Sequence, residues 1–195
     1  MPVSPKCNKK PISRKLFSYI NNLDQTHIKI LDLGIGNGDF AEIIRKMKFD
    51  NKIINITGIE IWKKYKNPKW ELYDEIVIGD ILKYVKDQSK PFDVILLLDV
   101  LEHFNYEEGL TIIENIKRIN NGLIIISTPV TKCPQGAYKG NSWETHRHIW
   151  KIKELNHFGF KVLQSKWVLL IGAIKERQFW PLFTKFSVLC HEHKN

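Results

Sequence analysis

Short apolar runs alternate with amphipathic stretches along most of the 195-residue chain. The apolar runs are nearly continuous, which is typical of strands buried on both faces of a parallel sheet. Between them, apolar residues recur three or four positions apart, as in a helix with one buried face. Strands are expected at 28–33, 53–60, 73–80, 92–99 and 122–128, with one or two final strands over 160–174.

The remaining patterned segments predict helices. These are expected at 12–22, 39–48, 106–119 and 149–158, and 177–189 is expected to be a terminal helix or an apolar flap. Alternation of strand and helix indicates an α/β fold with a doubly wound sheet. No repeat or linker divides the chain, so residues 12–195 are expected to form one domain. Residues 1–11, with three prolines and several lysines, are expected to form a flexible basic arm.

Composition narrows the class of protein. Hydrophobic residues make up 43% and charged residues 26%, close to globular averages. No apolar run approaches the roughly 20 residues of a membrane span, and the basic N-terminus has no secretory h-region, so we expect a cytoplasmic protein. The three cysteines show no CxxC spacing, which excludes a zinc ribbon. The net charge of +9 favours anionic partners such as RNA, or reflects a lysine-rich surface throughout.

The stretch ILDLGIGNGDFAEII, residues 30–44, runs from a strand through three glycines into a helix. Glycines let a ligand approach the backbone, and the following helix start attracts negative charge. A dinucleotide fingerprint would place its third glycine at position 39, where this chain has Asp39. A carboxylate there would repel a pyrophosphate but not a sulfonium or a zwitterionic amino acid. The loop therefore favours S-adenosylmethionine (AdoMet) over a dinucleotide.

Carboxylates mark the ends of the first three expected strands. In a doubly wound sheet the ligand lies beyond the carboxyl ends of the strands, where these side chains would meet. Asp32 stands just before the glycines, Glu60 ends the second strand and Asp80 the third. Glu60 is placed to accept hydrogen bonds from ribose hydroxyls, and Asp80 to reach an adenine amino group.

Four segments in order, LDLGIGNG, GIE, IGD and FDVILLLDVLEHF, resemble the successive motifs of class I AdoMet-dependent methyltransferases. The run DVLEH at 99–103 resembles the type-11 branch of that class. The resemblance implies a mostly parallel, seven-stranded Rossmann-like sheet with helices on both faces, and AdoMet as cofactor. The cofactor-binding residues that it implies are Asp32, Gly34, Gly36, Gly38, Glu60, Ile61, Asp80, Ile81 and Asp99.

Two loops carry the candidates for the chemistry. Methyl transfer is an in-line displacement that depends on holding the acceptor in place, and a base is needed for a hydroxyl or a protonated amine. His103 in DVLEHF is the first candidate for a base, and His146 in NSWETHRHIW (141–150) the second. The other side chains expected to contact the acceptor are Glu144, Arg147 and His148.

The expected acceptor is a small or medium-sized metabolite, and no metal ligand is assigned. An RNA methyltransferase is the first alternative, and a non-catalytic methyltransferase-like scaffold is another. Part of the pattern resembles the metal site of small-RNA 2′-O-methyltransferases, with Glu102, His103, His146 and His148 as the ligands implied. RNA would be favoured if one cleft gathered Lys9, Lys10, Arg14, Lys63, Lys64 and Lys66. The sequence leaves open the identity of the acceptor and its reacting atom, the use of a metal, the oligomeric state and the pathway.

Overall fold

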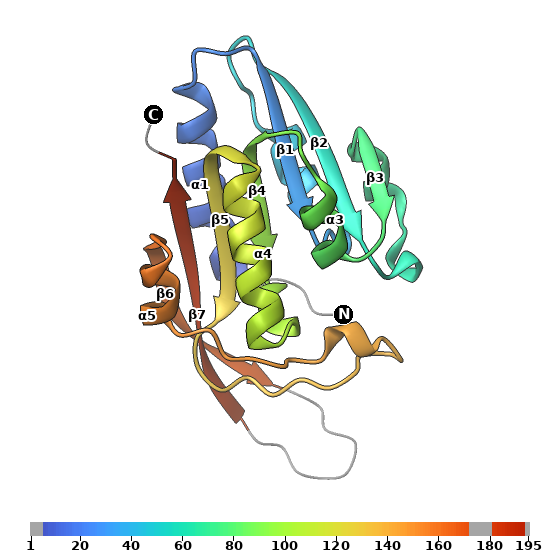
Figure 1. The fold of residues 1–195 in the computed structure, drawn as a ribbon, viewed down its shortest axis with the longest axis vertical. Helices are drawn as coiled ribbons and strands as arrows, with labels where there is room; N and C mark the ends of the chain where they lie inside the picture. Colours follow the sequence, from blue (N-terminus) through green and yellow to red (C-terminus); the bar gives the residue numbers. More distant parts are fainter. Residues whose placement is uncertain (1–5, 172–180, 194–195) are drawn as a thin grey trace.

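The computed structural model describes residues 6–171 and 181–193. Seven strands form one sheet in the order β3-β2-β1-β4-β5-β7-β6 (Figure 1). The first five strands pair in parallel, and β7 runs antiparallel to both of its neighbours. The predicted mostly parallel, seven-stranded sheet is confirmed. The strands are β1 (His27–Leu33), β2 (Ile53–Glu60), β3 (Glu75–Ile78), β4 (Phe92–Leu98), β5 (Asn120–Pro129), β6 (Lys161–Ile171) and β7 (Pro181–Glu192).

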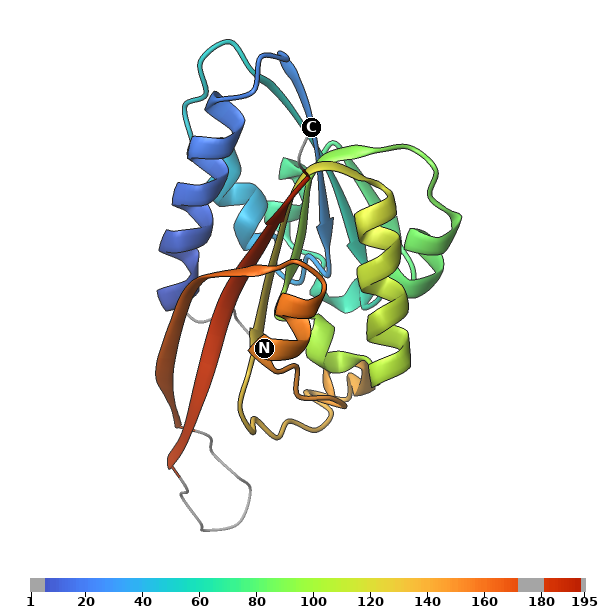
Figure 2. The same ribbon diagram turned by 60° about the vertical axis from the view of Figure 1, so that its left-hand side comes forward.

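Helices cover both faces of the sheet, as predicted (Figure 2). They are α1 (Lys6–Asn21), α2 (Asp39–Lys46), α3 (Ile81–Asp87), α4 (Tyr106–Arg118) and α5 (Ile152–His157). Successive residues of a strand point to opposite faces. Val94 and Leu96 of β4 therefore pack with α1 and α2, whereas Ile95 and Leu97 pack with α3, α4 and α5. Each face of the sheet therefore has its own apolar core.

Short 3-10 helices follow three of the parallel strands. They are η1 (Lys63–Tyr65) and η2 (Pro68–Leu72) after β2, η3 (Leu101–His103) after β4, and η4 (Ser142–Glu144) after β5. Because the carboxyl ends of parallel strands share one edge of the sheet, these turns gather at that edge. None of the described helices is both long and apolar enough to span a membrane.

The C-terminal segment differs from its prediction. A terminal helix or flap was expected over 177–189, but Pro181–Glu192 forms β7, between β5 and β6. Residues 177–180 of that range lie outside the described residues. A short apolar run does not by itself distinguish strand from helix. Pairing with distant strands decides it here, since Leu189 lies opposite Ile126 of β5 and Val162 of β6.

The predicted N-terminal arm is wrong from Lys6 onward. Helix α1 begins at Lys6, with Pro11 inside it, and residues 1–5 lie outside the described residues. A proline in a helix interior loses one backbone hydrogen bond, which is why the sequence suggested a boundary there. The helix persists because Asn8 and Ile12, one turn apart, are both buried against the body of the protein. Helix α3 was also missing from the predicted elements.

Candidate cofactor and acceptor site

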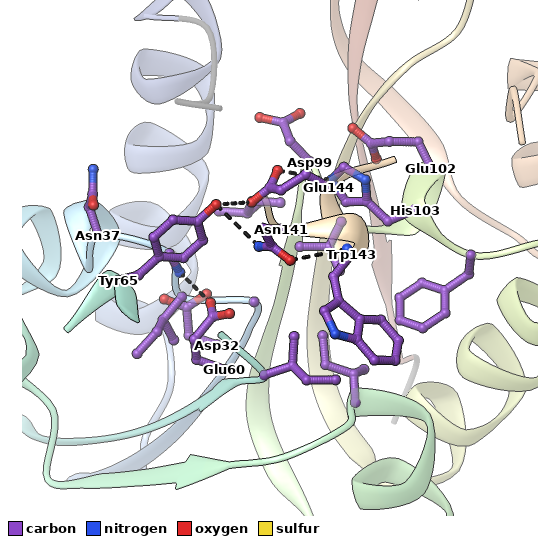
Figure 3. Close-up of a pocket in the computed structure, with 18 of the residues that line it drawn as sticks. Asp32, Asn37, Glu60, Tyr65, Asp99, Glu102, His103, Asn141, Trp143 and Glu144 are labelled. Atoms are coloured by element: carbon purple, nitrogen blue, oxygen red, sulfur yellow. Dashed lines mark hydrogen bonds and ion pairs between the residues drawn. The ribbon is translucent and has the colours of Figure 1, made fainter. Parts of the chain in front are cut away.

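A cavity of about 370 Å³ opens at the carboxyl edge of the parallel strands (Figure 3). Its volume lies within the range of small-molecule sites. The cavity brings together most of the predicted site residues: Asp32, Gly34, Gly36, Glu60, Ile61, Asp80, Ile81, Asp99, His103, Glu144 and His146. Gly38, Arg147 and His148 are not among the described residues that line it. One space therefore joins the expected cofactor end to the expected acceptor end.

The turn after β1 needs glycine at two positions for two different reasons. Gly34, Gly36 and Gly38 all have positive φ, a region that other residues rarely adopt. A Cβ on Gly34 would lie 2.4 Å from Cγ2 of Val100, so only glycine lets the two segments pass so closely. A Cβ on Gly36 would meet no atom within 4 Å, and Gly36 lines the cavity. The missing side chain at Gly36 thus leaves space for a ligand. Gly38 instead precedes α2 as its N-cap.

Residues after β2 hold the turn in place. The backbone N–H of Gly36 donates to Oε2 of Glu60 at 2.9 Å, and Nε1 of Trp70 donates to the carbonyl of Gly36 at 2.8 Å. Nδ2 of Asn67 donates to the carbonyl of Asn37 at 3.1 Å. Asn67 and Trp70 were missed from the sequence, because their partners lie about 30 positions away in the chain.

Asp39 does not act as the sequence suggested. Nζ of Lys9 and Nζ of Lys69 bind its two carboxylate oxygens at 2.8 and 2.7 Å. Partial burial opposes ionisation, but the hydrogen bonds from Lys69 and Lys9 outweigh it and lower the pKa of Asp39. Two ammonium groups therefore compensate its charge. Repulsion of a pyrophosphate by Asp39 is a weaker argument in the folded protein than in the sequence.

The other carboxylates at the cofactor end are buried or partly buried. Burial raises the pKa of Asp32 to about 6, although the hydroxyl of Tyr73 donates to Oδ2 of Asp32 at 2.7 Å. Burial also raises the pKa of Glu60, whose Oε1 accepts the N–H of Trp62. Oδ1 of Asp80 caps α3 by accepting from the N–H of Leu82. These contacts leave carboxylate lone pairs for a ligand.

The sign of charge in the cavity is negative. Seven carboxyl side chains and no lysine or arginine are among the described residues that line it. Asp39 is paired with two lysines and burial favours the protonated form of Glu102, so the negative charge comes from the other carboxylates. A sulfonium and an ammonium group would be stabilised there, whereas a pyrophosphate would not. The cavity as a whole supports the cofactor choice that Asp39 alone does not.

The acceptor end begins at Asp99, directly after β4. Its φ is 55°, a conformation that costs a residue other than glycine about 1–3 kcal/mol and that is enriched at functional sites. The hydroxyl of Ser127, in β5, donates to Oδ1 of Asp99 at 2.8 Å. The neighbouring strand thus helps to hold Asp99 at the cavity wall.

Glu102, His103 and His146 lie together at the acceptor end of the cavity. Their candidate metal-ligand atoms are all within 4.8 Å of one another. His148 is not part of this group. Nδ1 of His103 lies 3.4 Å from the carbonyl of Thr145, and Nδ1 of His146 lies 2.5 Å from that of Cys133. A carbonyl accepts only, so each contact favours a proton on Nδ1 and leaves Nε2 unprotonated.

Burial dominates the titration of this group. It raises the pKa of Glu102 well above its usual value, with the nearby Asp99 adding to the effect. It lowers the pKa of His103 to about 4, with His146 adding to the effect, and also lowers the pKa of His146. Both imidazoles are therefore neutral at pH 7.

The expected acceptor contacts divide into two groups. Glu144 lines the cavity, where it accepts a hydrogen bond from Tyr65. Arg147 is exposed, and its backbone N–H donates to the carbonyl of Glu102. The ring of His148 packs against those of Tyr106 and Trp150, which also stack on each other. Further lining residues that sequence reasoning missed are Tyr65, Phe104, Gln135, Asn141, Trp143 and Phe186.

Comparisons with known proteins address the family and the fold. A family model described as a methyltransferase domain matches residues 9–165. The mitochondrial ubiquinone biosynthesis O-methyltransferase of Candida albicans is 24% identical over 106 residues, which cover 51% of this chain and 32% of that protein. The chain spans 60% or less of the length of the curated relatives it matches.

Solved structures share the fold. TehB from Haemophilus influenzae superposes with a TM-score of 0.66 at 16% identity, covering 95% of this chain and 62% of TehB. A SAM-dependent methyltransferase from Archaeoglobus fulgidus superposes with a TM-score of 0.57 at 15% identity, covering 97% of this chain and 95% of that one. With most of its length matched by the family model, the chain belongs to the methyltransferase-domain family of class I enzymes, whose cofactor is AdoMet.

Proposed function

We propose that the protein transfers a methyl group from AdoMet to a small or medium-sized metabolite. The observation that carries the proposal is the single cavity, which runs from Gly36 and Glu60 at one end to His103 and His146 at the other. AdoMet supplies the electrophilic methyl group. The chain's own part is to hold both molecules in line and to exclude water, a contribution worth about 7–11 kcal/mol at best.

The cofactor-binding roles follow the order of the strands. Gly34 and Gly36 would let the aminoacid and ribose end approach the backbone, with Asp32 beside them. Glu60 would accept hydrogen bonds from the ribose hydroxyls. The remaining roles are adenine packing by Ile61 and Ile81, contact with the adenine amino group by Asp80, and contact near the methionine part by Asp99. Gly38 would act through α2, which it caps.

His103 is the proposed base for a hydroxyl or ammonium acceptor, with His146 as second choice. Its Nε2 lies 3.9 Å from Oε2 of Glu144, so that carboxylate would stabilise the imidazolium formed when His103 takes a proton. A pKa of about 4 makes His103 a weak base. The proposal therefore needs the acceptor and Glu144 to raise that pKa.

Calorimetry tests the cofactor assignment. The protein is titrated with S-adenosylhomocysteine (AdoHcy), with NAD and with buffer alone. We expect saturable binding of AdoHcy only. No AdoHcy binding at concentrations that saturate related enzymes would contradict the assignment, and so would equal binding of NAD.

Transfer of label from tritiated AdoMet tests the acceptor class. The protein is incubated with a small-molecule extract and, separately, with RNA. Label in the small-molecule fraction supports the proposal, label in RNA supports the first alternative, and AdoHcy binding without any transfer supports the non-catalytic scaffold. His103→Ala should abolish transfer, whereas His157→Ala, on the exposed side of α5, should not.

A metal-assisted O-methyltransferase is the second candidate, favoured by one observation. Glu102, His103 and His146 are close enough to share a divalent ion, and backbone carbonyls orient both rings, as is usual for metal ligands. Such an ion would hold an acceptor oxygen near the methyl group. Treatment with EDTA should then abolish transfer, and Mg²⁺, Mn²⁺ or Zn²⁺ should restore it. Transfer that is unchanged in EDTA would exclude this candidate.

A further inference from the structure

Tyr65 and Glu144 form a bridge across the cavity. Tyr65 lies in η1, just after Glu60 and Ile61 at the cofactor end, and Glu144 lies in η4 at the acceptor end. The hydroxyl of Tyr65 donates to Oε1 of Glu144 at 2.5 Å, between residues 79 positions apart (Figure 3). Two turns that belong to different strands are thus joined over the same space.

The surroundings of Tyr65 and Glu144 favour a strong hydrogen bond between them. Burial, and then the hydrogen bond to Glu144, raise the pKa of Tyr65, so the phenol remains protonated and donates at physiological pH. Glu144 is only 8% exposed. Burial also raises the pKa of Glu144, and low exposure strengthens the hydrogen bond that its oxygen accepts.

The acceptor side of the bridge has supports of its own. Asn141, 2% exposed, donates through Nδ2 to the Tyr65 oxygen at 3.3 Å and caps η4 through Oδ1, which accepts the N–H of Trp143. Nε2 of Gln135 donates to the carbonyl of Glu144 at 2.7 Å. Removing the Tyr65 hydroxyl would leave a buried amide and a buried carboxylate each short of a partner, which is costly.

The bridge also reaches the proposed base. Oε1 of Glu144 is held by Tyr65, and Oε2 of the same carboxylate faces Nε2 of His103 at 3.9 Å. A shift of Tyr65 would therefore move the carboxylate that faces His103. The geometry points to Tyr65 as a positioning residue: a cofactor held by the segment after β2 would order the acceptor loop, residues 138–148, through Tyr65 and Glu144. This inference rests on the proposed function, and it predicts that the cofactor binds before the acceptor.

Hydrogen exchange of a peptide covering 138–148, with and without AdoHcy, tests this coupling without knowledge of the acceptor. In the unchanged protein, AdoHcy should slow exchange in this peptide by about fivefold or more. Tyr65→Phe and Glu144→Ala should abolish that protection. Glu144→Gln should keep most of it, because an amide oxygen still accepts from the phenol. The control is Tyr84→Phe on α3, which loses a hydroxyl that accepts from Gln88, away from the cavity.

AdoHcy affinity gives a second readout. Tyr65→Phe and Glu144→Ala should each weaken binding about tenfold, and the double variant should be no weaker than either, since both remove one contact. Full protection by AdoHcy in Tyr65→Phe, or additive losses in the double variant, would overturn the inference. If Tyr65→Phe does not fold, the Glu144→Ala and Glu144→Gln pair decides, because equal protection in both would overturn it as well. No AdoHcy binding by the unchanged protein would instead overturn the proposed function.

Discussion

Gly34 and Gly36 differ in what a methyl group would meet, so alanine at each position separates stability from binding. Gly34→Ala places Cβ against Val100 and should lower the free energy of unfolding by about 2–4 kcal/mol. Gly36→Ala meets no atom and should cost about 1 kcal/mol, from its positive φ. Its methyl group would occupy cofactor space, so AdoHcy affinity should fall about tenfold or more. Urea unfolding and calorimetry measure the two effects, and normal AdoHcy binding by Gly36→Ala would contradict the role given to that glycine.

Asp32 should make the cofactor-free protein less stable as pH rises. Its pKa in the folded state, about 6, lies above the ordinary value, so the folded state binds the proton more tightly than the unfolded state does. The stability from this group is present below about pH 4 and is lost as pH rises through 6. Asp32→Asn should therefore be more stable than the unchanged protein by about 2–3 kcal/mol at pH 8, at 1.36 kcal/mol per pKa unit.

Urea unfolding at several pH values checks this expectation. The advantage of Asp32→Asn should shrink toward zero as the pH falls to about 4. The control is Asp87→Asn, at an exposed position of α3. A difference that does not depend on pH would mean that burial of the Asp32 charge is not its cause.

At the level of elements, η2 holds the glycine turn. Trp70→Phe keeps an apolar ring but removes the donor to the carbonyl of Gly36, so AdoHcy affinity should fall about three- to tenfold and stability by about 1 kcal/mol. Trp150→Phe removes a similar indole donor, to the carbonyl of Leu101, and serves as the matched control. It should lower stability by a similar amount with AdoHcy affinity kept within about twofold. Equal losses of affinity would contradict a specific role for η2.

Most strands could be predicted because a strand that is buried on both faces consists of consecutive apolar residues. The predicted strands 28–33 and 53–60 match β1 and β2 within one residue. Their terminal carboxylates were predicted to meet, since parallel strands end at one edge. Strand β7 was missed because pairing with β5 and β6, distant in sequence, fixes its conformation. The Tyr65 and Trp70 contacts were missed for the same reason: no local pattern records a partner 34 or 79 residues away.

Over the whole molecule, the exterior and the cavity carry opposite signs of charge. The net charge is +9, yet seven carboxylates and neither lysine nor arginine line the described part of the cavity. Lys9 is paired with Asp39 rather than available to a partner, and the other basic side chains named for an RNA cleft are exposed and do not line the cavity: Lys10, Arg14, Lys63, Lys64 and Lys66. Attraction for polyanions is thus expected at the outer surface, separate from the cavity.

This separation predicts how RNA should bind. Fluorescence anisotropy with a labelled single-stranded RNA should show weak binding that falls about 100-fold between 50 and 200 mM salt, for about five phosphate contacts. Saturating AdoHcy should leave that affinity unchanged, because contacts on the outer surface do not involve the cavity. An RNA acceptor would have to place a nucleotide beside the cofactor. The affinity for such an RNA would therefore depend on AdoHcy, and part of it would remain at high salt. Such linkage would favour the RNA alternative, and its absence would count against it.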